Sequence, residues 1–186
     1  MKTPASLLGI LAVIGILSLG LTQSAKANLI VNGGFETGDF TGWIVTTGSP
    51  NTFVSGSPHT GVYAAWSGAA APSDCQIGQI VPTAPGTYTI DFWLANLGDG
   101  PNHFYVYWAS TLIFSLTDAA AFDYTHYSFD LTGYGGDSLT FEFSHDPSYW
   151  LIDDVGVVSA PDAGSTLPLL GFALLGVATL RRKLNL

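Results

Sequence analysis

Lysine and arginine are almost absent from this chain of 186 residues, and the few that occur lie near its ends. The five basic residues are Lys2, Lys26, Arg181, Arg182 and Lys183. All fourteen acidic residues lie between Glu36 and Asp162. Because a segment of this charge repels phosphate groups and anionic lipid, we expect neither a nucleic acid partner nor binding of this segment to a membrane surface. Divalent cations and neutral molecules are the compatible partners.

Cysteine occurs once, at Cys75, which excludes an intramolecular disulfide. Stability must therefore come from a hydrophobic core or from a bound metal ion. A single cysteine in an exported protein is either a reactive thiol or a small apolar residue of the core. Cys75 begins a strand-like run over residues 75–81, which favours the buried position.

Long apolar runs are confined to the two ends of the chain. The first 27 residues contain Lys2, an apolar run over residues 7–21, and small residues at Ala25 and Ala27. A charged start, an apolar centre and a small-x-small site are typical of a secretory signal peptide. We therefore predict a signal peptide over residues 1–27, which signal peptidase removes before Asn28.

The second apolar run lies near the C-terminus. Residues 160–186 consist of a polar motif (160–166), an apolar segment (167–180) and a basic tail (181–183), with a few residues after it. As a helix, the apolar segment would be about 21 Å long, shorter than the roughly 30 Å hydrocarbon core of a bilayer. Because Arg and Lys stay on the cytoplasmic side, the basic tail predicts a transmembrane segment held transiently in the inner membrane.

This C-terminal region resembles the sorting signals of the PEP-CTERM type, in the variant whose signature is VPDSG followed by Ser-Thr. Ala160 and Ala163 replace the Val and the Ser of that signature. The residues that match are Pro161, Asp162, Gly164, Ser165, Thr166, Gly171, Gly176, Arg181 and Arg182. The resemblance implies that an exosortase-type protease cuts near the Pro-Asp pair. The protein would then stay in the cell envelope, on the cell surface or in the extracellular matrix.

Residues 28–159 remain, and they suffice for one domain with a full core. No stretch has a helical period. Short runs rich in aromatic and β-branched residues alternate with clusters of Gly, Pro, Asn and Asp. We predict an all-β sandwich or barrel whose strands cover residues 43–47, 61–67, 75–81, 87–95, 103–109, 111–116, 124–131, 138–144 and 149–158.

Alternation along these strands assigns their faces. The expected core residues are Tyr88, Ile90, Phe92, Leu94, Leu139, Phe141 and Phe143. By the same alternation Trp93, Tyr105 and Tyr107 point outward, and Asp91 lies beside Trp93. Rings next to carboxylates suit sugar recognition, because the apolar face of a pyranose stacks on a ring while its hydroxyls bond to polar groups. The alternative is that these aromatic side chains fill the core.

Carboxylates occupy both ends of the predicted domain. Glu36 lies in a glycine-rich bend over residues 32–43, and Asp153 and Asp154 interrupt an apolar strand. An unpaired carboxylate beside a core is costly, and no Lys or Arg of the domain can neutralise it, so a hard cation is the expected partner. The alternative is that these carboxylates are solvated or accept hydrogen bonds from backbone N–H groups.

These two segments, NGGFETGDFTGW and LIDDV, resemble the first and last motifs of jelly-roll, galactose-binding-like carbohydrate-binding modules. Residues 59–65 resemble the Gly-Tyr-Ala strand of the same modules. The resemblance implies a jelly-roll β-sandwich of two antiparallel sheets and a structural calcium ion, which prefers oxygen ligands. The implied calcium site comprises Gly34, Glu36, His59, Thr60, Asp153 and Asp154.

Recognisable catalytic motifs are scarce. The acidic residues form many possible pairs, no G-x-S-x-G turn occurs, and the four histidines lack metal-ligand spacing. The leading hypothesis is therefore a non-catalytic exported protein that binds extracellular polysaccharide or another neutral glycan. Two alternatives stay open: a structural matrix or surface-coat protein without a sugar site, and a small glycoside hydrolase.

Overall fold

The computed structural model describes residues 26–47, 51–68, 74–160, 176 and 181–182. Residues 27–160 form one compact unit. Most of the predicted signal peptide and of the predicted sorting segment, including residues 161–166, lies outside the described residues, whereas Arg181 and Arg182 are described as helical and exposed. Within the part that is described, no helix is long and apolar enough to cross a membrane.

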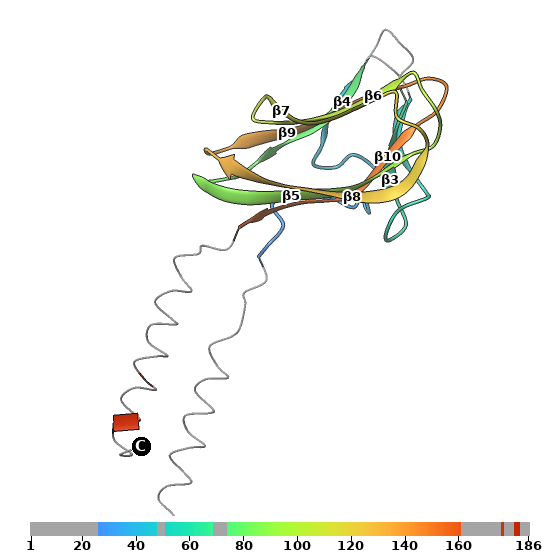
Figure 1. Ribbon diagram of the computed structural model, residues 1–186. Coiled ribbons are helices and arrows are strands. Elements are labelled where there is room, and N and C mark those ends of the chain that lie inside the picture. Colours follow the sequence, from blue (N-terminus) through green and yellow to red (C-terminus); the bar gives the residue numbers. More distant parts are fainter. Residues whose placement is uncertain (1–25, 48–50, 69–73, 161–175, 177–180, 183–186) are drawn as a thin grey trace, which may run out of the picture. The chain divides into compact units, whose positions relative to one another are not determined.

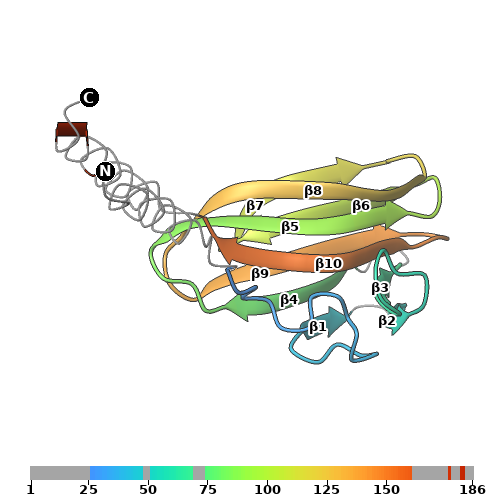
Figure 2. The ribbon, with the colours of Figure 1, turned by 90° about the horizontal axis from the view of Figure 1, so that it is seen from below.

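The described residues of the domain form ten strands in two five-stranded antiparallel sheets, which face each other as two layers (Figures 1 and 2). Sheet A has the strand order β1-β4-β9-β6-β7, and sheet B has the order β2-β3-β10-β5-β8. This arrangement confirms the predicted jelly-roll β-sandwich. The strands are β1 (Ile44–Thr47), β2 (Thr52–Ser55), β3 (Ala64–Ser67), β4 (Cys75–Val81), β5 (Gly86–Asn96), β6 (Asn102–Trp108), β7 (Thr111–Thr117), β8 (Phe122–Gly133), β9 (Asp137–His145) and β10 (Trp150–Ser159).

The core lies between the sheets and is rich in aromatic rings. All of the predicted core residues are buried: Tyr88, Ile90, Phe92, Leu94, Leu139, Phe141 and Phe143. Phe92 is at its centre, with its ring centroid 5.2 Å from that of Phe141 and 5.9 Å from that of Phe104. Cys75 is fully buried, as predicted. Because the described core residues all lie between Ile30 and Val157, the domain has a core of its own and can fold independently.

Two details of the strand pattern differ from the prediction. The sequence pattern does not predict β2, an edge strand that pairs only with β3 among the described strands. Its four residues have no alternating buried face, and Phe53 is 38% exposed, so periodicity gives no signal there. The strand predicted over residues 61–67 begins only at Ala64, because Gly61 has a φ of 73° and belongs to a bend.

Candidate functional site

A β-bulge in β10 places the acidic pair. The register between β10 and β5 shifts between Asp153 and Gly156, and Asp154 has a φ of 50°. The N-terminal segment lies directly against this bulge, since the Val155 N–H donates to the Gly33 carbonyl at 2.9 Å. A Cβ at residue 33 would lie 2.0 Å from the Val155 oxygen, so only glycine permits this approach.

The predicted calcium ligands of the N-terminal bend and of β10 lie together. A Cβ at Gly34 would be 3.6 Å from Asp154 Oδ1, 3.8 Å from Asp153 Oδ1 and 3.7 Å from Glu36 Cγ. Glu36 itself accepts hydrogen bonds from the N–H groups of Val62 (2.9 Å) and residue 63 (3.0 Å). Through these hydrogen bonds, the N-terminal bend holds the loop before β3 close to the β-bulge of β10.

His59 and Thr60, the remaining predicted ligands, contact the same acidic pair. Their backbone N–H groups donate to Asp153 Oδ2 at 2.8 and 3.1 Å. Their side chains bind Asp154, through His59 Nδ1 at 2.7 Å and Thr60 Oγ1 at 2.7 Å. The structure thus brings all six predicted residues into one cluster, hereafter the β10 cluster.

The carboxylates of the β10 cluster are hydrogen-bonded, which is the alternative that the sequence left open. Their oxygen donors suit calcium in kind. However, the ligand atoms of Glu36, Asp153 and Asp154 do not all lie within 4.8 Å of one another. One other group of the described residues meets that condition. Calcium binding here stays a prediction.

Asp153 is the most constrained member of the β10 cluster. Its side chain is fully buried, and no Lys or Arg occurs between residues 27 and 180. Burial raises the pKa of the Asp153 carboxyl to about 6, while the N–H groups of Thr60 and His59 work in the opposite direction. The cluster therefore holds a carboxyl group that is costly to ionise.

Trp93 lies on the outer face of sheet B, opposite Asp153 in the register, with Asp91 on the same face. It does not present an open platform. The His59 ring stacks on it at a centroid distance of 3.6 Å and an interplanar angle of 13°. Tyr124 lies edge-on to His59 at 5.6 Å. A sugar could stack on this side of the indole only after His59 moves away.

Tyr105 and Tyr107 lie on the outer face of the other sheet, sheet A, so the structure separates them from Trp93 and Asp91. Both are partly exposed rather than part of the core, and their rings are edge-on with centroids 6.5 Å apart. Glu142 of β9 lies opposite Tyr105, and Gln76 of β4 lies opposite Glu142. Gln76 Nε2 donates to Glu142 Oε2 at 2.6 Å. Rings, an amide and a carboxylate therefore occur side by side on this face.

Two shallow depressions flank these rings. The first, of about 120 Å³, is lined by residues that include Thr46, Gln76, Gly78 and Thr140. Gly78 leaves room there, because a Cβ at this residue would lie 3.1 Å from Thr140 Oγ1. The second, of about 280 Å³, is lined by residues that include Asp74, Asn102, His103, Asp118 and Asp146.

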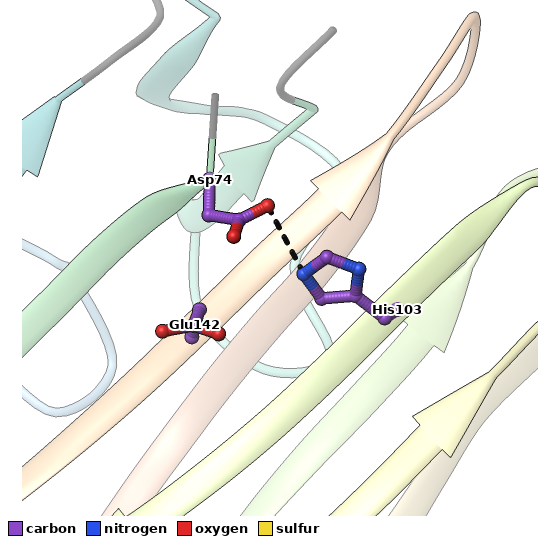
Figure 3. Close-up of side chains that lie close together, drawn as sticks. All are labelled: Asp74, His103 and Glu142. Carbon is purple, nitrogen blue, oxygen red and sulfur yellow. Dashed lines mark ion pairs between the residues drawn. The ribbon is translucent and has the colours of Figure 1, made fainter. Parts of the chain in front are cut away.

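One group of potential ligands on this face was not predictable from the sequence pattern: Asp74 before β4, His103 on β6 and Glu142 on β9 (Figure 3). Their ligand atoms all lie within 4.8 Å of one another. They are far apart in the sequence, and only the strand order β4-β9-β6 brings them together. Local spacing of histidines therefore gave no signal for this group.

Comparison with protein families identifies the C-terminal segment. Residues 161–184 match the model of the VPDSG-CTERM motif, which confirms the predicted resemblance of this tail. A search of curated proteins finds no match to the chain.

Solved structures with a similar fold include TmCBM61 in complex with β-1,4-galactotriose (18% identity, TM-score 0.62, 72% of this chain and 99% of that chain). The CBM22-1 xylan-binding domain of Paenibacillus barcinonensis Xyn10C is also similar (15% identity, TM-score 0.51, 75% and 100%). So is part of an enzyme, the arabinose-bound MgGH51 α-L-arabinofuranosidase (9% identity, TM-score 0.55, 74% and 27%). At these identities the likeness concerns the fold alone. The chain thus carries a VPDSG-CTERM motif at its C-terminal end, and its domain has the jelly-roll fold of carbohydrate-binding modules.

Proposed function

We propose that this protein is exported and binds a neutral glycan through the outer face of sheet A, without catalysing a reaction. The observation that supports this proposal is the arrangement of Tyr105 and Tyr107 beside Gln76 and Glu142, next to the depression at Gly78. The His103 ring covers one face of Tyr105. The ring of Tyr107 and the uncovered part of Tyr105 would therefore offer the apolar surface to sugar C–H groups, and the two hydroxyls would offer a polar one. The amide and the carboxylate can bond to sugar hydroxyls.

The dimensions of this face suit an extended chain of sugars. Five strands at about 4.8 Å spacing form a surface roughly 20 Å wide. The depression at Gly78 and the two rings lie on the strands β4, β9 and β6, which are neighbours. An oligosaccharide running across the strands would therefore contact the rings and the depression together.

The negative charge of this face favours a neutral glycan. Glu142 and Asp74 lie on or beside the proposed surface, and the domain has no Lys or Arg to pair with a uronic acid or a sulfate group. A polyanionic polysaccharide would be repelled. The proposed ligand is therefore a neutral polysaccharide of the cell surface or the extracellular matrix.

A binding screen tests this proposal. Residues 28–160 would be incubated with insoluble and soluble polysaccharides, and binding would be followed by co-sedimentation and by quenching of aromatic fluorescence. We expect saturable binding to at least one neutral polysaccharide and none to polyuronates. A folded domain that binds no neutral glycan at millimolar concentration of sugar units would refute the proposal.

The route of export is part of the same proposal. The VPDSG-CTERM motif supports processing by an exosortase-type protease near Pro161 and Asp162, after signal peptidase has removed residues 1–27. Residues 167–180 would hold the precursor in the inner membrane until that cut is made. Expression beside a matching exosortase should release a shortened chain, and deletion of residues 161–184 should abolish that processing.

We also propose a structural calcium ion for the β10 cluster. Support comes from the gathering of Glu36, Asp153 and Asp154 without any Lys or Arg, and from the complete burial of Asp153. These side chains, with carbonyl oxygens near Gly34 and His59, would hold the ion. It would neutralise the buried charge and fix the loop before β3 on the N-terminal bend.

The structural-coat alternative has one observation in its favour. Ile44, Ile80 and Leu112, all on strands of sheet A, are 63%, 60% and 51% exposed. Apolar side chains on a sheet surface can also serve contacts between proteins. Saturable self-association in the absence of any glycan affinity would favour this alternative, whereas monomeric protein that binds a glycan would favour the proposed function.

A further inference from the structure

We infer that Asp74, His103 and Glu142 form a binding site for a divalent transition metal ion of the Zn²⁺ type on the outer face of sheet A (Figure 3). The three side chains come from the segment before β4, from β6 and from β9, and Figure 3 shows the Asp74 carboxylate facing the His103 ring with Glu142 beside them. One imidazole nitrogen and two carboxylates form a donor set that suits Zn²⁺. The site differs from the β10 cluster, which offers oxygen donors on the other sheet.

The distances agree with a small tetrahedral ion. Two ligand atoms that each lie about 2.0–2.1 Å from such an ion are roughly 3.3 Å apart. His103 Nε2 lies 3.2 Å from Asp74 Oδ1, and the nearest ligand atoms of all three residues lie within 4.8 Å of one another. A modest rotation of the Glu142 carboxylate would complete a three-ligand site.

The Nε2 atom of His103 supplies independent evidence. This atom is buried, yet it makes no hydrogen bond within the described part of the chain, even though Asp74 is close. A buried polar atom without a well-formed hydrogen bond is costly, so native proteins usually provide one. A metal ion between His103 and the two carboxylates would bind Nε2 in place of its ion pair with Asp74 Oδ1.

Neighbouring side chains hold the ligands in place. The His103 ring stacks on Tyr105 at a centroid distance of 4.6 Å and an interplanar angle of 11°. Gln76 Nε2 donates to Glu142 Oε2 at 2.6 Å. Contacts of this kind orient the ligands of metal sites and fix the ring or carboxylate that binds the ion.

The surroundings attract cations and leave a route of entry. The depression of about 280 Å³ that reaches Asp74 and His103 is also lined by Asp118 and Asp146. No Lys or Arg between residues 27 and 180 competes for these carboxylates. Three protein ligands leave at least one coordination position for water or another small ligand, as in open zinc sites.

Calorimetric titration of tag-free residues 28–160 with Zn²⁺, after treatment with EDTA, tests this inference. We expect one saturable equivalent. His103→Gln and Asp74→Asn should each weaken binding at least tenfold, and Gln76→Ala should weaken it by roughly 10- to 100-fold. The matched control is His126→Gln, because His126 Nε2 lies 3.9 Å from Asp91 with no third ligand among the described residues. This control should bind Zn²⁺ like the wild type.

A second readout needs no variant. In a long-range ¹H–¹⁵N spectrum of the imidazole groups, one equivalent of Zn²⁺ should shift the His103 Nε2 signal and leave that of His126 unchanged. Asp74 is 45% exposed and precedes its strand, so Asp74→Asn should fold normally, which circular dichroism would verify. The inference would be overturned if Zn²⁺ failed to bind at one equivalent, if it left the His103 signal unchanged, or if folded Asp74→Asn and His103→Gln bound it as well as the wild type. None of these measurements requires a glycan, so they are independent of the proposed function.

Discussion

The buried carboxyl of Asp153 should make the stability of the domain fall as the pH rises. This carboxyl is fully buried, and its pKa is raised by burial from 3.8 to about 6. Because this pKa is higher in the folded state than in the unfolded chain, the folded state binds the proton more tightly. The resulting stabilisation is complete below about pH 4 and is lost as the pH rises through about 6. A shift of about two units, at about 1.4 kcal/mol per unit, corresponds to roughly 3 kcal/mol.

Urea unfolding of the wild type and of Asp153→Asn, measured from pH 4 to pH 7 in EDTA, isolates this effect. Asparagine does not titrate. The Asp153→Asn substitution also weakens hydrogen bonds, but this loss changes the free energy of unfolding by an amount that does not depend on pH. We expect the wild type to lose about 2.4 kcal/mol relative to the variant between pH 4 and pH 7, because the unfolded chain is already partly ionised at pH 4. Parallel stability curves for the two proteins would refute the reasoning. Calcium, if it binds, should favour the ionised carboxylate and reduce this pH dependence.

Gly33→Ala should destabilise the domain by about 1–3 kcal/mol in urea unfolding, because the added Cβ would lie 2.0 Å from the Val155 carbonyl oxygen. Gly56→Ala, at a residue with nothing within 4 Å of the added Cβ, is the control and should have little effect. Calcium at a hundred times its dissociation constant should stabilise the domain by about 2.7 kcal/mol, and Glu36→Gln should remove most of that gain; an unchanged melting temperature would contradict the calcium proposal. Trypsin should leave denatured residues 28–160 uncut, since they contain no Lys or Arg, and mass spectrometry of fragments from within this range would contradict the processing boundaries.

The fold was largely predictable from the sequence because one periodicity dominates the strands. In β5 and β9, apolar residues alternate with polar ones, so Phe92 and Phe141 could be assigned to the core. β2 was not predictable, since its stability comes from pairing with β3 and not from an alternating face of its own. The start of β3 was predicted too early, because Gly61 belongs to a bend and not to the strand.

The candidate sites were predictable only in part. Resemblance identified the members of the β10 cluster, and alternation placed Tyr105 and Tyr107 outward. Neither could show that His59 covers Trp93, because that contact depends on the path of a loop. The group of Asp74, His103 and Glu142 depends on strand order, which no local pattern contains.

The outer face of sheet A and the indole of Trp93 are the two surfaces that the sequence pattern predicts for sugar stacking, and variants of their rings distinguish between them. The measurement is the affinity of Tyr105→Ala, Tyr107→Ala, Trp93→Ala and Tyr134→Ala for the neutral polysaccharide that binds the wild type. Tyr134 is 74% exposed and lies on neither surface, which makes it the control for loss of a tyrosine. We predict that each of the first two variants loses about 1–2 kcal/mol of binding free energy, which is roughly tenfold in affinity, while Trp93→Ala and Tyr134→Ala bind normally. Normal binding by both Tyr105→Ala and Tyr107→Ala would contradict the proposal that sheet A carries the glycan site.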